Sequence, residues 1–339
     1  MVTTASDRRP VRVAVIGVRH WHSLWDAAYL RTLADMPNVE LVGIQDDDLW
    51  IARDRAEAVR NPAVFTDYGQ MLEEVAPDLV LTLGRHSEMA ATVSYVIDSG
   101  YPQVAEKPIG VTAEQVRMVA DLADAAGAFV TVPFPWRIQP AFTTAVRLLA
   151  EGALGELSNI YLRCIRPDYA RYLAWDCEWM LDPHAAGGGA LRNIGPHFFD
   201  ILLNLVGDRV AVESAQLNCT TVTGVEDYAS VHLRTAGGVI ATVEVGNLTP
   251  TSDMDVEIRI MGSVGTYLAT SSMISLITDE GHEAREVVAT PDMTRVWLSD
   301  AIARWQRGEG PRSSARDCYE ACQLIDRAYQ VASRRCESG

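Results

Sequence analysis

A lysine at the end of a predicted strand is a first candidate for acid–base chemistry. Lys107 closes the stretch 103–107 and precedes Pro108, which disfavours a helical backbone at the lysine. At the end of a strand in a parallel sheet, a lysine faces the ligand crevice, whereas a merely solvated lysine usually lies on a helix surface. Burial there would lower the pKa of its ammonium group toward a range useful for proton exchange.

A histidine and an amide four residues apart form a second candidate group. His197 follows Pro196, which is tolerated in the first turn of a helix, and Asn193 falls on the same helix face. Histidine is suited to take a hydroxyl proton while a hydride leaves the neighbouring carbon. A histidine satisfied by backbone groups in an apolar helix is the alternative, but the glycines at 187–189 and Lys107 favour chemistry. Together these residues indicate alcohol–ketone redox chemistry.

The elements that must position Lys107 have the pattern of βαβ units. Residues 1–137 alternate strand and helix signals, and their strands show little polar alternation, as expected when helices cover both faces of a sheet. This pattern predicts a Rossmann-type, doubly wound parallel sheet with strands at 11–17, 39–45, 78–83, 103–107 and 128–134.

The remaining residues, 138–339, form a predicted second domain of different character. Hairpin-length connections favour a mainly antiparallel sheet, and a closing helix is predicted at about 312–335. A strand is predicted at 158–167, and period-two alternation predicts further strands at 213–221, 228–234, 239–245, 256–261 and 265–270. The chain is therefore predicted to be an α/β protein of two domains.

The turn after the first strand is expected to meet the pyrophosphate of a dinucleotide. In a doubly wound fold, the glycines of a GxGxxG turn let the backbone of a helix N-terminus approach the phosphates. Only Gly17 of that pattern is kept, and Arg19, His20 and Trp21 follow it. Arg19 could offset a lost glycine, because a charged hydrogen bond contributes roughly 1.5–3 kcal/mol. A surface arginine beside packing histidines is the alternative.

The end of the second strand carries residues that would select the cofactor. Asp46 and Asp47 stand where an acidic residue accepts hydrogen bonds from ribose hydroxyls, and a carboxylate there repels a 2′-phosphate. This favours NAD over NADP, with a solvated acidic loop as the alternative. Gly84 and His86, which follow the third predicted strand, complete the expected cofactor-binding set on this side.

The composition excludes several classes of partner. A net charge of −16 and a pI near 4.8 argue against nucleic acid and anionic membranes. No run reaches the roughly 18 apolar residues of a membrane helix and no signal-type segment is recognisable, so a cytoplasmic protein is expected. The six cysteines lack metal-ligand spacing, so neither a metal site nor disulfides are expected.

A loop rich in aromatic residues offers candidates for substrate binding. Tyr169, Tyr172 and Trp179 have aromatic faces and polar tips, which suit a sugar or polyol, although large aromatics can equally pack a loop over a sheet. Arg192, beside Asn193, meets either an anionic substrate or solvent. A small sugar-like or polyol-like molecule is the expected substrate.

The sequence resembles the Gfo/Idh/MocA oxidoreductases over nearly its whole length. VRVAVIG, AEKP, PFPWRIQPAF, WMLDPHAAGGGALRNIGPHFFD and VEIRIMGSVGTYLAT stand in the order found in that family. The resemblance implies an N-terminal Rossmann domain, an open antiparallel sheet that often forms a dimer face, and NAD(P)-linked oxidation of sugars, cyclitols or related alcohols. A homodimer or homotetramer is expected accordingly. It also implies that Lys107 is the lysine of the EKP motif, that His197 is the general acid–base, and that Glu106 and Arg137 lie near the nicotinamide.

Two departures from the family pattern affect the mechanism. The family's usual aspartate four residues before the histidine is Asn193 here, and Arg19 and His22 replace two glycines of the turn. An asparagine can orient an imidazole but cannot balance its positive charge, and in serine proteases the equivalent exchange costs about 10⁴ in rate. Lys107 could then carry the proton transfer, or the substrate could supply a charge.

Three functions therefore stay open. The leading one is an NAD-dependent dehydrogenase or reductase that acts on a carbohydrate-like secondary alcohol. The second is a lyase or glycosidase that retains NAD and oxidises its substrate only transiently. The third is a non-catalytic, dinucleotide-sensing protein, which the lost glycines and Asn193 suggest.

Overall fold

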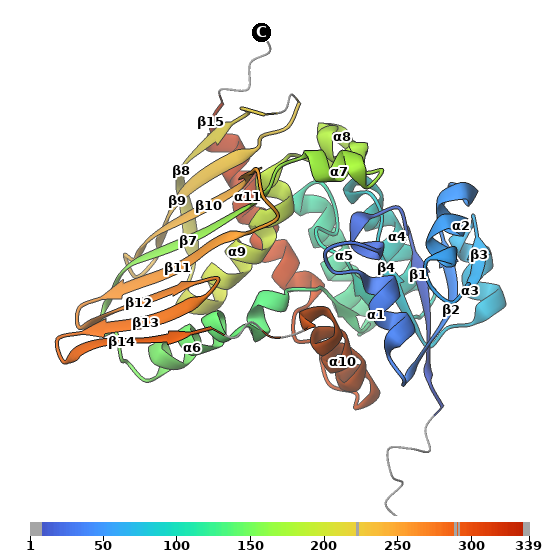
Figure 1. Cartoon of the computed structure of the whole chain (residues 1–339), viewed down its shortest axis with the longest axis horizontal. Coiled ribbons are helices and arrows are strands. Elements are labelled where there is room, and N and C mark those ends of the chain that lie inside the picture. Colours follow the sequence, from blue (N-terminus) through green and yellow to red (C-terminus); the bar gives the residue numbers. More distant parts are fainter. Residues whose placement is uncertain (1–8, 222–223, 288–289, 291, 335–339) are drawn as a thin grey trace, which may run out of the picture.

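The computed structural model describes residues 9–221, 224–287, 290 and 292–334. These residues form two β-sheets with helices between them (Figure 1). Among them, no helix is long and apolar enough to cross a membrane, and the location in the cytoplasm stays a prediction.

The first sheet has six parallel strands in the order β3-β2-β1-β4-β5-β6. All residues of β4, and nearly all of β1, are buried, which explains why these strands lack polar alternation. The strands are β1 Val11–Ile16, β2 Val39–Gln45, β3 Ala63–Phe65, β4 Leu79–Thr82, β5 Gln103–Ala105 and β6 Val130–Thr131. The predicted doubly wound sheet is confirmed, and the direction of winding reverses between β1 and β4, where such folds bind ligands.

Five helices connect the strands of the first sheet. They are α1 Tyr29–Asp35, α2 Leu49–Glu57, α3 Tyr68–Val75, α4 His86–Asp98 and α5 Ala113–Ala126. Helix α5 is capped at its N-terminus by Thr112, whose hydroxyl accepts a hydrogen bond from Gln115 N, and at its C-terminus by Gly127.

The second sheet has nine strands in the order β14-β13-β12-β11-β7-β10-β9-β8-β15. Its pairs are antiparallel except β7 with β10 and β8 with β15. The strands are β7 Leu157–Pro167, β8 Val210–Asn218, β9 Tyr228–Thr235, β10 Ile240–Thr249, β11 Asp255–Gly262, β12 Gly265–Thr270, β13 Met273–Thr278, β14 Gly281–Glu286 and β15 Ser333–Arg334. The predicted mainly antiparallel sheet is confirmed.

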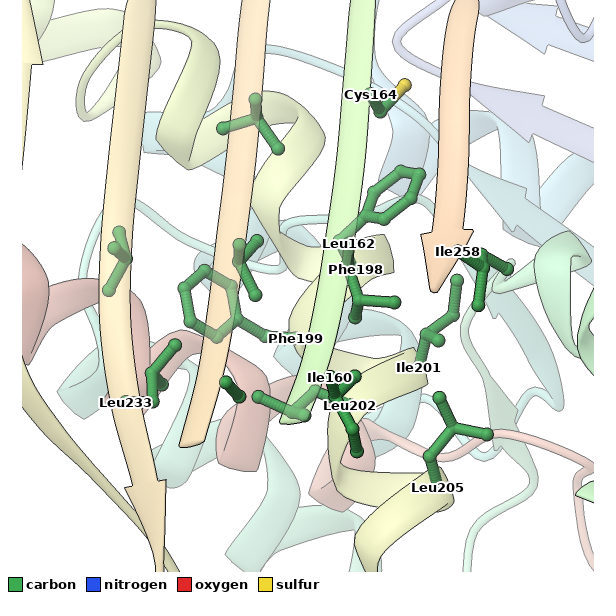
Figure 2. Packing of buried hydrophobic residues seen from close by; sticks show 14 of the residues in the cluster. Ile160, Leu162, Cys164, Phe198, Phe199, Ile201, Leu202, Leu205, Leu233 and Ile258 are labelled. Atoms are coloured by element: carbon green, nitrogen blue, oxygen red, sulfur yellow. The ribbon is translucent and has the colours of Figure 1, made fainter. Parts of the chain in front are cut away.

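One face of the second sheet is covered by helices and the other is open (Figure 1). The covering helices are α6 Pro140–Ala150, α9 Ala190–Val206 and α11 Ala315–Val331. Figure 2 shows the apolar side chains of α9, including Phe198 and Phe199, packed on Ile160 and Leu162 of β7. Alternation along β7 leaves the other face of the sheet partly exposed.

The last part of the chain returns to the first sheet. Trp297 and Leu298 of α10, Met293–Gln306, lie in the same apolar core as β1 and α1, and α11 packs on α5. Shorter elements near the crevice are the 3₁₀ helices Trp21–Ser23, Pro135–Ile138 and Glu178–Leu181 and the helices α7 Ala170–Ala174 and α8 Pro183–Ala186. Arg335, the predicted end of the closing helix, lies outside the described residues.

Two local expectations are wrong. Helix α9 begins at Ala190, so Pro196 lies inside the helix rather than in its first turn and leaves the carbonyl of Arg192 without its helical donor. Cys219, directly after β8, is disulfide-bonded, whereas Cys164, Cys177, Cys318 and Cys322 are free thiols.

Candidate active site

Lys107 lies just beyond β5 and is the only lysine in the 339-residue sequence. Its side chain is buried, with 3% exposed, and its Nζ donates hydrogen bonds to Asn193 O and Asn193 Oδ1, both at 2.8 Å. An ammonium group has three N–H donors, so one position of Nζ stays directed to a further acceptor. Burial and then the charge of Arg166 lower the pKa of Lys107 to about 8, against the opposing attraction of Glu106.

Asn193 is held in the first turns of α9 by contacts on both sides of its amide. Its Nδ2 donates to Tyr172 Oη at 2.7 Å, while its Oδ1 accepts from Lys107. The start of α9 is fixed by the Glu226 carboxylate, which accepts from Gly189 N at 2.9 Å and Leu191 N at 3.0 Å. A Cβ on Gly189 would lie 1.9 Å from Glu226 O, so only glycine allows this approach.

His197 lies one turn after Asn193 and lines the same cavity. Burial and the charge of Lys107 lower its pKa well below the usual value, so the imidazole is neutral at pH 7. The ring meets Phe134 edge-on at 5.7 Å between centroids, and Nδ1 has no hydrogen-bond partner among the described residues. Since the Asn193 amide is bonded to Lys107 and Tyr172, the structure does not show it orienting the imidazole.

Glu106 fixes the loop after β1 against the sheet. Its carboxylate accepts from Tyr29 Oη at 2.9 Å and from Lys107 N at 3.0 Å, and it lies 3.3 Å from His22 Nδ1. Although burial acts the other way, His22 and Lys107 hold the pKa of Glu106 below its usual value. Glu106 is therefore charged at neutral pH.

A cavity of two adjoining parts lies in front of these residues. The outer part has a volume of about 230 Å³ and the inner part about 30 Å³. Both are lined by His22, Asp26, Trp136, Arg166 and His197. The inner part reaches Lys107, Asn193 and Tyr172.

Several lining residues of this cavity were not predicted as site residues. Asp26 and His22 belong to a loop that the sequence assigned to the phosphates of a cofactor, and Arg166 belongs to a strand whose partner elements are distant in sequence. A detectable signal was nevertheless present, because 18–26 is rich in histidine and tryptophan where a phosphate turn is rich in glycine.

A second cavity, of about 420 Å³, lies at the ends of β1, β2 and β4. It is lined by Gly17, Arg19, Asp46, Asp47 and Gly84, all predicted to bind cofactor. A Cβ on Gly84 would meet no atom closer than 3.8 Å, so the backbone is open to a ligand there. The lining therefore fits the adenosine end of a dinucleotide.

The guanidinium of Arg19 is bonded to carboxylates and not free for a phosphate. Its Nη2 lies 2.6 Å from Asp46 Oδ1 and also contacts Asp47. Asp46 is buried, with 1% exposed, and also accepts from Arg19 N at 2.8 Å. The Asp47 side chain is 65% exposed, so it is the carboxylate that a ribose can reach.

Buried rings separate the two cavities. His20 stacks on Trp21 at 3.9 Å, and His86 meets Trp179 at 5.1 Å between centroids. His86 Nδ1 lies 2.8 Å from Ala186 O, and burial lowers its pKa to about 3.

The expected helix N-terminus is absent from the turn after β1, because a 3₁₀ helix occupies it and α1 begins only at Tyr29. The cavities share no lining residue in the described ranges.

Four residues that were predicted to lie near the substrate or the nicotinamide do not line the cavity beside Lys107. Arg137 is bonded to Asp200, Asp317 and Arg312 O; Tyr169 donates to Glu226 O at 3.1 Å; Trp179 packs on His86; and Arg192 pairs with Asp326 at a separate cavity of about 400 Å³. Of the aromatic residues predicted to bind substrate, Tyr172 alone lines the inner cavity, and Trp21, which was predicted to bind cofactor, lines it as well.

Models of known protein families match two long stretches of the chain. Residues 11–134 match the oxidoreductase family with an NAD-binding Rossmann fold, and residues 142–268 match the GFO/IDH/MocA C-terminal domain. The chain belongs to the Gfo/Idh/MocA oxidoreductase family. The predicted membership is confirmed, as is a nicotinamide-dinucleotide-binding type of first domain.

This Gfo/Idh/MocA protein is similar to several dehydrogenases. The D-glucoside 3-dehydrogenase of Escherichia coli K12 is 27% identical over 208 residues, which are 60% of this chain and 56% of the relative. The inositol 2-dehydrogenase 1 of Saccharopolyspora erythraea is 24% identical over 327 residues, 93% and 92% of the two chains. The matched stretch covers less than two thirds of the first relatives, including 63% of the trans-1,2-dihydrobenzene-1,2-diol dehydrogenase of Oryctolagus cuniculus.

Solved structures share the fold. An oxidoreductase from Agrobacterium radiobacter, in complex with NAD+, L-tartaric acid and magnesium, has a TM-score of 0.82 at 16% identity, covering 95% of this chain and 96% of that chain. A 3-ketoreductase from Actinomadura kijaniata, in complex with NADP and TDP-benzene, has a TM-score of 0.80 at 20% identity, covering 96% and 98%. Since one holds NAD+ and the other NADP, they do not distinguish the cofactor.

Proposed function

We propose that this protein is an NAD-dependent dehydrogenase or reductase that acts on a secondary alcohol or ketone of a sugar, cyclitol or related polyol. The observation that carries this is Lys107, the only lysine of the chain, buried with a pKa of about 8 and held by Asn193 at the inner end of a cavity. A group with a pKa near the working pH is suited to acid–base catalysis, and arginine cannot replace it because arginine does not deprotonate.

In the oxidation direction, neutral Lys107 takes the proton of the substrate hydroxyl. Two positions of Nζ are bonded to Asn193, so the hydroxyl meets the third. The hydride leaves the same carbon as the C=O bond forms, and bound NAD+ supplies the acceptor for it. In the reduction direction, the charged ammonium returns the proton to the carbonyl oxygen.

His197 and Tyr172 have supporting roles in this scheme. The neutral imidazole of His197 hydrogen-bonds a substrate hydroxyl and fixes its orientation beside Lys107. The Tyr172–Asn193 bond at 2.7 Å holds the amide that positions the amine. The proton transfer is thus assigned to the lysine, which does not require an aspartate beside the histidine.

NAD is proposed over NADP because of the charges at the adenosine end. The exposed Asp47 carboxylate accepts hydrogen bonds from ribose hydroxyls and repels a 2′-phosphate. Arg19 cannot attract that phosphate strongly while Asp46 and Asp47 neutralise it. A dinucleotide that reaches both cavities requires the side chains of 18–22 to shift, because these residues lie between them.

A non-catalytic dinucleotide sensor is the second candidate, favoured by the closed turn around Trp21. Calorimetric titration with NADH and NADPH, followed by turnover of sugars and cyclitols with NAD+, separates the two. Binding of NADH tighter than NADPH together with NADH production supports the dehydrogenase. Binding without turnover of any polyol supports the sensor, and binding of neither cofactor contradicts both.

We also infer a homodimer or homotetramer that uses the open face of the second sheet. This face carries exposed apolar side chains, including Ile240 and Ile277, each 42% exposed. Sedimentation equilibrium tests the inference, and Ile277→Glu is expected to weaken the assembly.

A further inference from the structure

Arg166 stands at the wall of the cavity where a substrate would lie. It is the last residue but one of β7, on the strand face that points to the helices, and it lines both the inner and outer parts of the cavity. Its side chain is 25% exposed, and its Nη2 pairs with Asp26 Oδ2 at 3.0 Å. Its Nε is buried without a hydrogen-bond partner in the described part of the chain. The guanidinium therefore has donors that the protein itself does not satisfy.

The two carboxylates in the cavity lining, Asp26 and Glu106, are placed differently relative to its cationic side chains. Lys107 is bonded to two neutral oxygens of Asn193, and the Glu106 carboxylate faces Tyr29 and His22 instead.

The Asp26 carboxylate interacts with the charges of several side chains at once. After the opposing effect of burial, the charges of Arg166, His22, Arg171 and Lys107 all act on it and keep its pKa below the usual value. Arg166 therefore shares its one paired carboxylate with other groups, so a substrate anion can add a contact to this guanidinium.

We propose that the substrate carries a carboxylate that binds Arg166 while its reacting hydroxyl lies beside Lys107. The substrate class is then a sugar acid or another small polyhydroxy carboxylate rather than a neutral sugar. This inference rests on the proposed function and names the substrate of that same site. The planar fork of an arginine matches the two oxygens of a carboxylate.

The charge balance of the reaction favours an anionic substrate. When the hydroxyl proton moves to Lys107 and the hydride leaves with two electrons for NAD+, the amine becomes a buried cation and the alcohol carbon becomes a carbonyl. A substrate carboxylate on Arg166 adds to the attraction that Glu106 exerts on this cation, which neutral Asn193 does not supply. The carboxylate itself is unchanged by the reaction. A single charge suffices, whereas the second charge of a phosphate would meet Asp26 and Glu106 in the same cavity.

Matched pairs of ligands test the proposal by calorimetry on the NADH-loaded protein. The pairs are D-glucuronate with D-glucose, D-galacturonate with D-galactose, D-gluconate with D-glucitol, and L-tartrate with L-threitol. In at least one pair the acid is expected to bind about tenfold or more tightly than its neutral partner, because a charged hydrogen bond discriminates to at least this degree. Turnover with NAD+ is expected to show the same preference in kcat/KM.

Two variants connect the preference to Arg166. Arg166→Gln is expected to bring the ratio of acid to neutral binding close to one, and Arg166→Lys is expected to keep part of it. Arg163→Gln is the matched control, because Arg163 lies on the same strand but on the opposite, open face, paired with Asp255. Circular dichroism and a thermal melt verify that each variant is folded.

Three results would overturn the inference. These are equal or tighter binding of the neutral partner in every pair, an acid preference that persists in folded Arg166→Gln, and tighter binding of D-glucose 6-phosphate than of any acid. Failure of the proposed function gives a different result, since it appears as no NADH binding or as no turnover of acids and neutral polyols alike. Turnover of neutral sugars alone leaves the dehydrogenase standing and removes only the carboxylate.

Discussion

The cavity beside Lys107 and the turn after β1 use charged groups in opposite ways. In the cavity, Asn193 and Tyr172 hold the amine so that one of its positions faces the open space. In the turn, the charge of Arg19 is bonded to Asp46 and Asp47, and buried rings fill the place of a helix N-terminus. The side chains around Lys107 are therefore positioned before a ligand binds. The cofactor cavity, in contrast, must replace contacts of Arg19 within the protein by contacts with the ligand.

The largest expected effect comes from removing the amine. Lys107→Met should lower kcat by about 10³-fold or more, because general acid–base catalysis typically contributes about 10²–10⁴. The NADH dissociation constant should change less than about threefold, since the adenosine cavity does not include Lys107. Steady-state kinetics and calorimetry measure the two quantities.

Lys107→Arg sharpens this result. Arginine keeps the positive charge but cannot release a proton at ordinary pH, so the variant should be nearly as inactive as Lys107→Met. A variant that retained more than about a tenth of the wild-type kcat would show that the lysine positions substrate by its charge and does not transfer the proton.

The next effect concerns glycines. Three of them, at 187–189, lie before α9, whereas the turn after β1 has only Gly17 of the three that a GxGxxG turn contains. Gly189→Ala would place a Cβ 1.9 Å from Glu226 O, so the free energy of unfolding should fall by about 3 kcal/mol. Gly127→Ala is the control, because it has φ +58° but no atom within 4 Å of the added Cβ, and should cost about 1 kcal/mol. Urea denaturation measures both, and equal losses would contradict the close docking of α9.

The pH dependence tests the electrostatics of Asn193. Oxidation needs neutral Lys107, so kcat/KM for oxidation should rise with pH through about 8, and that for reduction should fall through the same pH. Asn193→Asp places a carboxylate on the amine, stabilises the ammonium and should raise the midpoint by about 1–2 pH units. Asn159→Asp, on the open face of β7, should leave the midpoint in place. An unchanged midpoint in Asn193→Asp would show that another group titrates.

The smallest expected effect lies at the cofactor end. Asp46→Asn removes one of the two carboxylates bonded to Arg19, so the guanidinium can meet a 2′-phosphate. The ratio of NADPH to NADH affinity should rise by about tenfold, corresponding to one charged hydrogen bond. Calorimetric titration with both cofactors checks this, and a constant ratio would mean that Arg19 does not face the ribose.

The sequence was sufficient for the sheets and for the convergence of Lys107, Asn193 and His197. Lys107 follows a strand of the parallel sheet and so lies at its ligand-binding edge, and Asn193 and His197 share one face of α9 because they are four residues apart. Four strands in the described ranges were not predicted: β3 and β15 have only three and two residues, β14 is exposed throughout, and β13 was missed although it has an apolar sequence.

The structure places Arg137, Arg192 and the loop at 18–26 elsewhere than the sequence predicted. The partners of Arg137 and Arg192, Asp200 and Asp326, lie 63 and 134 residues further along the chain, and nothing in the local sequence indicates such pairs. The loop at 18–26 was assigned by analogy to a phosphate turn, although its histidines and tryptophans are too large for one. The sequence did contain one further signal for the site, because Lys107 is the only lysine of the chain.

Because the chain has one lysine, the central claim can be tested on a single signal. Protein grown with [¹³Cε]lysine gives one ε-methylene resonance, whose chemical shift reports the protonation of Lys107 as pH is varied. The account predicts a midpoint at about 8, lowered from the ordinary 10.5, and a higher midpoint in Asn193→Asp. A midpoint near 10.5 would contradict it, because the lysine would then stay charged and could not accept a proton at working pH.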